Sequence, residues 1–324
     1  MAIQASTYIW QNGQLIPWHE ATVHVLSHAI HYGSSVFEGV RVYATPDGPA
    51  AFRLTEHIDR LFDSARIHRI PMPFDRDVLL GASEQVVVEN GLQSAYLRPV
   101  VFRGYGSLGL VAGEDVATEV VVAAVSWGRY LGEEAMEQGV DVAVTSWQRP
   151  APNTVPALAK AGGNYLSGSL ISSEAKRHGY GEGIALSHDG LVSEGAGENL
   201  FLVRDGVLYT PPVAASILGG ITRDSVMHMA EDLGLTVREQ PMPREMLYLA
   251  DEAFFTGTAA EITPIRSVDG IAVKAGGRGP ITHRLQERFF GLFDGSTPDV
   301  HGWLTHFPNP MTQAQEMPHV ANAV

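Results

Sequence analysis

The sequence predicts an α+β protein that is divided into two domains. The chain has 324 residues, and a length above about 300 usually exceeds what one hydrophobic core can cover. Helix-like and strand-like segments alternate over the first part, whereas the second part is rich in short strands. Between them, residues 128–138 are polar and rich in Gly and Glu, as is typical of a domain junction. We therefore expect a small N-terminal domain over 1–127, a junction over 128–138 and a larger domain over 139–324.

The first domain is expected to contain a hairpin, two helices and two long strands. Asn12-Gly13 is a two-residue turn signal between two short apolar segments. Thr55 is a candidate N-cap for a helix whose apolar residues recur every three or four positions. The expected elements are strands at 8–10 and 14–16, helices at 55–65 and 77–90, and strands at 95–103 and 118–127.

The second domain is expected to be built mainly from short strands. Two Asp-Gly turns, at 189–190 and 205–206, separate apolar segments and predict hairpins. Gly234 ends a helical pattern. The expected elements are a strand at 140–146, a helix at 164–176, strands at 184–187, 191–193, 200–203 and 207–209, a helix at 222–233 and a strand at 252–256. The last fifteen or so residues have no pattern and are expected to fray.

Composition excludes several classes of function. The formal net charge of −14, without a basic stripe, argues against nucleic acid as a partner. The absence of Cys excludes disulfides, thiolate metal sites and Cys nucleophiles. The longest apolar run, residues 120–125, is too short to cross a bilayer, and the first residues do not resemble a secretory signal. A cytoplasmic globular protein without a membrane segment is therefore expected.

The histidines and the glycine-rich stretches do not form a known catalytic motif. His24, His28 and His31 lie in a region expected to form strand and turn, and the HExxH signature of a metal site is absent. Ser193 is not part of a Gly-x-Ser-x-Gly motif, so a serine hydrolase is not supported. No P-loop or dinucleotide fingerprint is present either.

Lysine is rare in this chain, so each lysine can be considered separately. Lys176 lies on a charged helical segment and Lys274 in a Gly-rich loop, and both are expected at the surface. Lys160 has small apolar neighbours and no acidic residue close in sequence. A desolvated lysine of this kind is the usual amine for Schiff-base chemistry. The alternative is a lysine that extends from a strand edge into solvent, and the local sequence does not decide between the two.

Three other segments could complete a site for a phosphorylated cofactor. The stretch 193–200 places Glu194 and Glu198 between glycines, where a carboxylate could face a cation, although a single Glu is more often solvated. Gly219-Gly220 opens a helix at 222–233 and exposes N–H groups suited to an anion. Arg60 could bind a phosphate, but taken alone it is better explained as a surface residue paired with Asp59 or Asp63.

Together these segments resemble fold-type IV pyridoxal-phosphate enzymes, specifically the bacterial branched-chain amino acid aminotransferases. Several long motifs in the same order carry the resemblance, which covers roughly residues 5 to 304. The matching stretches are 31–41, 56–61, 96–99, 159–165, 193–200, 220–223 and 256–262. The resemblance implies a small N-terminal α/β domain and a larger, β-barrel-like C-terminal domain with helices.

The resemblance also implies roles for individual residues around pyridoxal 5'-phosphate. Lys160 would form a Schiff base with the cofactor and later act as acid and base. Glu194 would pair with the pyridinium nitrogen, and Tyr165 would hydrogen-bond the 3-oxygen of the ring. The residues that would hold the phosphate are Arg60, Ile221, Thr222 and Thr258.

The substrate would be bound beside the cofactor. By resemblance, Tyr96 and the main chain of Thr258 and Ala259 would bind the α-carboxylate, and Arg98 would receive the distal carboxylate of glutamate. The residues that would wall an apolar pocket are Phe37, Trp127, Tyr130, Tyr165 and Ala259. Tyr32 and Leu110 resemble residues contributed by a neighbouring subunit, so a homodimer is the expected minimum unit, with a hexamer as a further option.

The sequence departs from the family at two places. The first half of the 103–110 segment matches a substrate-facing loop poorly, so the side-chain preference is less well defined by the resemblance. Residues 217–220 lack the proline that usually precedes the phosphate loop. The expected reaction is transamination between a branched-chain L-amino acid and 2-oxoglutarate. Alternatives are a D-amino acid or (R)-amine transaminase or an aminodeoxychorismate lyase on the same fold, and a non-catalytic binding protein.

Overall fold

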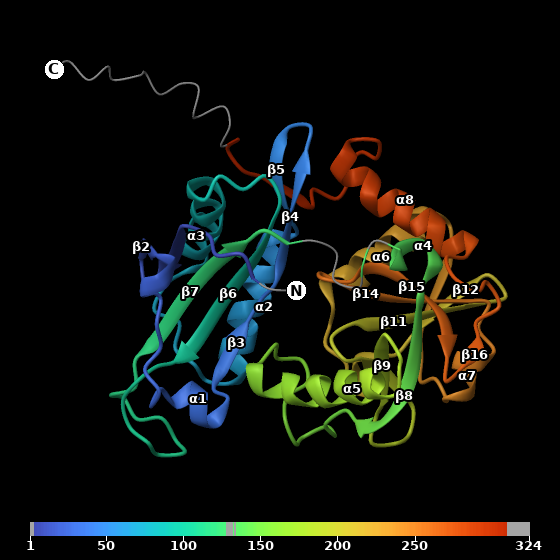
Figure 1. Ribbon diagram of the computed structural model, residues 1–324, viewed down its shortest axis with the longest axis horizontal. Helices are drawn as coiled ribbons and strands as arrows, with labels where there is room; N and C mark the ends of the chain where they lie inside the picture. The colour runs from blue at the N-terminus through green and yellow to red at the C-terminus, as the bar shows by residue number, and fades with distance from the viewer. Residues whose placement is uncertain (1–2, 128–131, 133, 310–324) are drawn as a thin grey trace.

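The protein consists of two β-sheets that lie side by side, each with its own helices (Figure 1). The computed structural model describes residues 3–127, 132 and 134–309. Among the described helices, none is long and apolar enough to cross a membrane. The strands of the first sheet run as far as Val125 and those of the second begin at Val140, apart from one C-terminal strand that returns to the first sheet. The exact domain limits remain a prediction.

The first sheet has eight strands, in the order β17-β5-β4-β6-β7-β1-β2, with β3 paired to β6. All of its printed pairings are antiparallel. The strands are β1 (Tyr8–Gln11), β2 (Gln14–Pro17), β3 (Ser35–Phe37), β4 (Val40–Thr45), β5 (Gly48–Phe52), β6 (Ala95–Arg103), β7 (Thr118–Val125) and β17 (Leu304–His306). The hairpin β1–β2 is confirmed, and its two turn residues have positive φ angles of 49° at Asn12 and 95° at Gly13, as a primed turn requires.

Three described helices accompany the first sheet, namely α1 (His28–Tyr32), α2 (Leu54–Ile67) and α3 (Arg76–Glu89). The predicted helices α2 and α3 are confirmed, because their apolar faces enter one core with the sheet. The predicted cap is wrong: Arg53, not Thr55, occupies the N-cap position, with a left-handed φ of 53°. Its guanidinium bonds Asp224 at 2.5 Å, so a contact from the other half of the molecule holds this conformation.

The segment with three histidines forms α1 and not the expected strand and turn. The helix is only five residues long and ends at Gly33, whose φ of 63° suits a C-cap. His28 is buried, with Nδ1 2.7 Å from Ser34 Oγ and Nε2 3.1 Å from the Gly109 carbonyl. The contact with Gly109 is distant in sequence, which explains why local pattern did not predict the helix.

The second sheet has nine strands, in the order β10-β9-β8-β15-β14-β11-β12-β13, with β16 paired to β15. The strands are β8 (Val140–Gln148), β9 (Glu182–Leu186), β10 (Val192–Gly195), β11 (Asn199–Arg204), β12 (Val207–Thr210), β13 (Thr236–Glu239), β14 (Glu252–Gly257), β15 (Glu261–Val268) and β16 (Ile271–Ala272). Strands β10 and β11 lie at different places in this order yet meet through a turn in which Gly195 N–H donates to the Glu198 carbonyl. The sheet is therefore curled, as the expected barrel-like domain requires.

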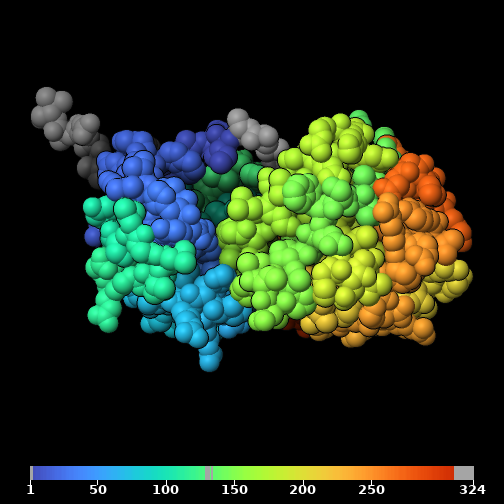
Figure 2. Space-filling view, turned by 90° about the horizontal axis from the view of Figure 1, so that it is seen from below, coloured from blue at the N-terminus to red at the C-terminus, as the bar shows by residue number. Residues whose placement is uncertain are grey.

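Five described helices surround the second sheet. They are α4 (Ala135–Gln138), α5 (Tyr165–Arg177), α6 (Ile221–Asp232), α7 (Glu245–Tyr248) and α8 (Pro280–Asp294). Helices α6 and α8 pack on one side of the sheet in a core that also contains Phe52 from the first sheet. Tyr43 of the first sheet stacks on Phe293 of α8 with ring centroids 3.5 Å apart. The two halves thus share buried aromatic surface, and Figure 2 shows them in contact along a broad front.

The loop before α5 joins the two halves at the place where the candidate lysine lies. Ala159 and Ala161 are buried in the core of the first half, at 2% and 1% exposure. Ala161 forms a β-bridge with Val36, and Phe37 N–H donates to the carbonyl of Lys160. Small apolar neighbours are therefore needed here, because they fix the backbone of this loop and leave only the Lys160 side chain to project from it.

Candidate active site

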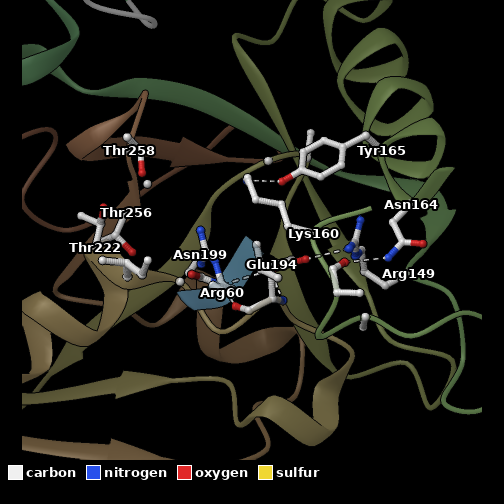
Figure 3. A pocket seen from close by; sticks show the side chains of 18 residues that line it. Arg60, Arg149, Lys160, Asn164, Tyr165, Glu194, Asn199, Thr222, Thr256 and Thr258 are labelled. Atoms are coloured by element: carbon white, nitrogen blue, oxygen red, sulfur yellow. Dashed lines mark hydrogen bonds and ion pairs between the residues drawn. The ribbon is translucent and has the colours of Figure 1, made fainter. Parts of the chain in front are cut away.

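A cavity between the two halves is lined by all seven residues predicted to bind a cofactor. They are Arg60, Lys160, Tyr165, Glu194, Ile221, Thr222 and Thr258. They come from α2, the lysine loop, α5, β10, α6 and the turn after β14. In Figure 3 three threonines lie on one side of Lys160, and Arg149 lies on the other side beyond Glu194.

Lys160 points into this cavity and not into solvent. Its Nζ donates a hydrogen bond to the Tyr165 hydroxyl at 2.6 Å and lies 5.0 Å from the centroids of the Phe37 and Tyr165 rings. The described residues include no carboxylate within ion-pair distance of it. By contrast, Lys274 is exposed and pairs with Asp251, and Lys176 is exposed as expected. The geometry supports an amine placed for covalent chemistry.

Glu194 lies at the end of β10 and is nearly buried. Its Oε1 is 2.8 Å from Arg149 Nη2, and its Oε2 accepts hydrogen bonds of 3.0 Å from Asn199 Nδ2 and the Leu218 N–H. Burial raises the pKa of Glu194 to about 7, against the opposing effect of Arg149. A carboxylate held in this way can pair with a cationic group in the cavity.

The start of α6 forms one end of the cavity and suits a bound anion. Gly220 is its N-cap residue and offers no side chain, so the first N–H groups of the helix are not capped from there. A Cβ atom at position 220 would collide with Asn199 Oδ1, which explains why glycine is needed. Thr256 Oγ1 is buried in the cavity wall without a hydrogen-bond partner among the described residues.

Arg60 reaches this end of the cavity from the other half of the molecule. The expected surface pairing with Asp59 or Asp63 is wrong for Arg60, because Arg76 pairs with Asp59. Instead, Arg60 Nε and Nη2 donate to the wholly buried Glu38 at 2.6 and 2.9 Å, and Nη1 donates to the Gly219 carbonyl at 2.8 Å. Two guanidinium protons remain available for a ligand.

Glu38 is held by a second buried residue as well. His57 Nδ1 lies 2.6 Å from Glu38 Oε2, and both side chains are at most 1% exposed. Burial tends to raise the pKa of Glu38, but Arg60 and His57 outweigh it and hold that pKa far below its usual range. Burial lowers the pKa of His57, so its ring is neutral and donates from Nδ1. The carboxylate thus fixes the orientation of Arg60.

A second, larger cavity of about 470 Å³ adjoins the first at Lys160 and Tyr165. The predicted substrate residues that line it are Phe37, Tyr96, Arg98, Trp127, Thr258 and Ala259. The Arg98 guanidinium lies over the Phe37 and Tyr96 rings, at 4.9 and 5.3 Å from their centroids. Its Nε is buried without a hydrogen-bond partner among the described residues. The cavity therefore combines aromatic walls with one guanidinium.

Three predicted substrate residues are not found in this cavity. Tyr130 lies outside the described residues. Tyr32 and Leu110 line neither cavity and are 42% and 78% exposed. The Tyr32 hydroxyl donates to the Leu108 carbonyl at 2.7 Å, so α1 and the loop before β7 form one continuous surface.

The sequence did not point to three residues that the structure places at the site. Glu38 and Asn199 lie inside the quoted motifs, but their partners come from other elements. Arg149 follows β8 and reaches Glu194 only because β8 and β10 flank β9 in the sheet. A signal that could have indicated Arg149 is its position at the end of a strand pattern, just before Pro150.

Comparison with known proteins agrees with this site. The family model "Amino-transferase class IV" matches residues 35–268, which is more than half of the chain. The branched-chain-amino-acid aminotransferase of Escherichia coli (strain K12) is 56% identical over 304 residues, covering 94% of this chain and 98% of the relative.

Solved structures are similar over the same range. The crystal structure of the Escherichia coli branched-chain amino acid aminotransferase has a TM-score of 0.92 at 56% identity, and the match covers 93% of this chain and 99% of the other. The branched-chain amino acid aminotransferase of "T.th." with pyridoxamine 5'-phosphate has a TM-score of 0.90 at 45% identity, with coverage of 93% and 99%. The chain therefore belongs to the class IV aminotransferases and is an enzyme of that family.

Proposed function

We propose that this aminotransferase moves the amino group reversibly between branched-chain L-amino acids (leucine, isoleucine and valine) and 2-oxoglutarate, with pyridoxal 5'-phosphate bound at Lys160. The observation that carries the proposal is the placement of Lys160 Nζ at the junction of the two cavities, beside Tyr165 and opposite Glu194. The names of the relatives at 56% identity support the choice of substrate.

The residues of the first cavity fit this cofactor. Arg60, Thr222, Thr258 and the N–H groups at the start of α6 would hold the phosphate, and the unpartnered Thr256 hydroxyl faces the same cavity. Glu194 would accept the N–H of the ring. When bound, the cofactor supplies an aldehyde carbon that takes up the amino group and a ring that withdraws electrons from the substrate Cα.

The protein supplies the proton transfers. Lys160 Nζ, once free of the cofactor, is the basic group close enough to both cavities to move a proton from one carbon to the next. The Tyr165 hydroxyl, 2.6 Å from Nζ, orients that amine. Glu194 would keep the proton on the ring nitrogen.

The second cavity supports both amino-acid partners. Phe37, Tyr96 and Trp127 provide a wall against which an aliphatic side chain can pack, and burial of that side chain drives binding. Arg98 can bind the distal carboxylate of glutamate, since its Nε is buried with no hydrogen-bond partner in the described part of the chain. One pocket can therefore accept either side chain.

We further propose that the enzyme works as a homodimer at least, in the cytoplasm. An exposed apolar surface runs from the segment before α1 to the loop before β7. Its members are Val23, Val25, Leu26, Ile30, Tyr32, Tyr105, Leu108, Leu110 and Val111. Contacts between the Tyr32 hydroxyl and Leu108, and between the rings of His24 and Tyr105, make this surface continuous. Large apolar patches of this kind are typical of subunit interfaces.

The proposal is tested on the purified protein. Borohydride reduction should trap a pyridoxyl group on Lys160, detected by peptide mass spectrometry, and Lys160→Ala should lose both the adduct and turnover. Half-reactions with L-leucine, D-alanine and an aromatic amine distinguish the branched-chain enzyme from same-fold alternatives. A colourless protein without an adduct would contradict the cofactor, and a preference for D-alanine or the aromatic amine would contradict the substrate.

A further inference from the structure

Arg149 occupies a position that the proposed reaction does not by itself explain. Its guanidinium lies 2.8 Å from Glu194 Oε1, and the two side chains are 8% and 7% exposed. Glu194 is the residue that would stabilise a cationic ring nitrogen, and a second cation beside it competes for the same carboxylate. A buried cation is costly to keep, so its presence calls for a physical reason.

The hydrogen bonds around Glu194 leave a defined direction for a further donor. Asn199 Nδ2 and the Leu218 N–H both donate to Oε2, and Arg149 donates to Oε1 (Figure 3). Each carboxylate oxygen has two lone pairs, so Oε1 retains one toward the cavity. The Arg149 backbone N–H donates to the Leu186 carbonyl at 2.9 Å, which anchors the residue at the end of β8.

The balance of charges around Glu194 determines where a shared proton resides. Burial favours a neutral carboxyl group, and the groups that oppose it are Arg149, the Leu218 N–H, Lys160 and Arg223. Glu198 is the nearby acidic residue whose own protonation Glu194 affects. A proton between Glu194 and a ring nitrogen can sit on either atom. Because Arg149 is in contact with the carboxylate and the ring lies beyond it, the attraction to the carboxylate exceeds the repulsion of the ring.

We propose that Arg149 is a positioning residue that keeps Glu194 ionised and directs its free lone pair to the cavity, so that the shared proton resides on the ring nitrogen of the bound cofactor. The inference rests on the proposed function, because it requires that cofactor. Arg149 does not touch the reacting atoms. It acts through Glu194, and through Glu194 it sets how strongly the ring withdraws electrons.

The test measures the protonation of the ring directly. Wild type, Arg149→Met and Arg149→Lys are loaded with pyridoxal phosphate carrying ¹⁵N in the ring, and the ¹⁵N chemical shift is followed with pH. We expect the wild-type ring to be protonated at neutral pH. In Arg149→Met the ratio of protonated to unprotonated ring should fall at least tenfold, together with kcat. Arg149→Lys keeps a cation and should restore most of the wild-type shift.

Two further variants separate this role from a structural one. In Glu194→Gln the ring should be unprotonated, and adding Arg149→Met should change the shift no further. Arg204→Met removes an exposed arginine on β11 and should leave the shift and kcat unchanged. If Arg149→Met does not fold, Arg149→Lys decides, because a ring that loses its proton despite the retained charge contradicts the proposal.

The outcomes distinguish this inference from the proposed function. If wild type binds no cofactor and borohydride traps no adduct on Lys160, the proposed function fails. If the cofactor binds and Arg149→Met gives the wild-type ¹⁵N shift, the inference about Arg149 is overturned while the proposed function stands.

Discussion

Replacing Glu198 by glutamine should stabilise the protein, and the gain should grow with pH. Glu198 lies in the turn between β10 and β11, is 6% exposed and lines the larger cavity. Burial, followed by repulsion from Glu182, raises its pKa to about 8, although the Gly197 N–H donates to it at 3.0 Å. An amide of the same shape keeps an acceptor for that N–H and carries no charge at any pH.

The magnitude follows from linkage between protonation and folding. The ordinary pKa is 4.5, so the folded protein retains a proton on Glu198 that the unfolded chain releases between pH 4.5 and about 8. The stabilising contribution of the protonated group is complete below 4.5 and is lost as the pH rises through about 8. Each pH unit corresponds to about 1.4 kcal/mol, which gives a loss of about 5 kcal/mol at most. Glu182 shares the effect, since burial raises its pKa as well.

Urea unfolding at one protein concentration, followed from pH 5 to pH 9, measures this difference. The free energy of unfolding of Glu198→Gln should lie close to that of wild type at pH 5 and exceed it by about 2 to 5 kcal/mol at pH 9. Glu231→Gln, at an exposed position of α6, is the matched control and should show no trend with pH. A difference between Glu198→Gln and wild type that is the same at every pH would refute the reasoning.

Three other predictions concern the two cavities. Glu38→Gln removes the buried partner of the phosphate-binding arginine, so we expect the free energy of unfolding to fall by about 3 to 5 kcal/mol and equilibrium titration to show weaker cofactor binding; wild-type affinity would contradict this. Arg98→Met should raise KM for 2-oxoglutarate about tenfold and leave KM for L-leucine nearly unchanged, as measured by half-reaction kinetics, whereas equal changes would reject the role. Gly220→Ala places a methyl group against the Asn199 side chain and should abolish cofactor absorbance, whereas Gly219→Ala, with open space around its Cβ, is the matched control; equal cofactor content in the two variants would argue against the collision.

Local pattern predicted much of the fold, because many elements carry their own signal. The β1–β2 hairpin follows from Asn12-Gly13, and α2 and α3 follow from apolar residues at helical spacing. The N-cap of α2 was predicted wrongly, since Arg53 is held in a left-handed conformation by Asp224 from the other half. Helix α1 was missed because its five residues depend on contacts with a distant loop.

The candidate site was predicted to a similar degree. Lys160 could be singled out because lysines are rare here and its neighbours are small and apolar, and the structure explains those neighbours by their burial in the first core. Arg60 could not be assigned from its own helix, because Glu38 and Gly219, which orient it, come from other elements. Arg149 was missed for the same reason: only the order of strands in the second sheet brings it to Glu194.

The way the chain crosses between its two halves restricts how the enzyme can open. Strand β17 returns to hydrogen-bond with β5, the Val36–Ala161 bridge lies directly beside the lysine loop, and Tyr43 stacks on Phe293. A hinge rotation of one half against the other would break backbone hydrogen bonds at both places and expose that aromatic stack. Ligands must therefore enter and leave through rearrangement of side chains and surface loops, while the rigid frame that fixes the distance between Arg60 and Lys160 stays closed throughout turnover.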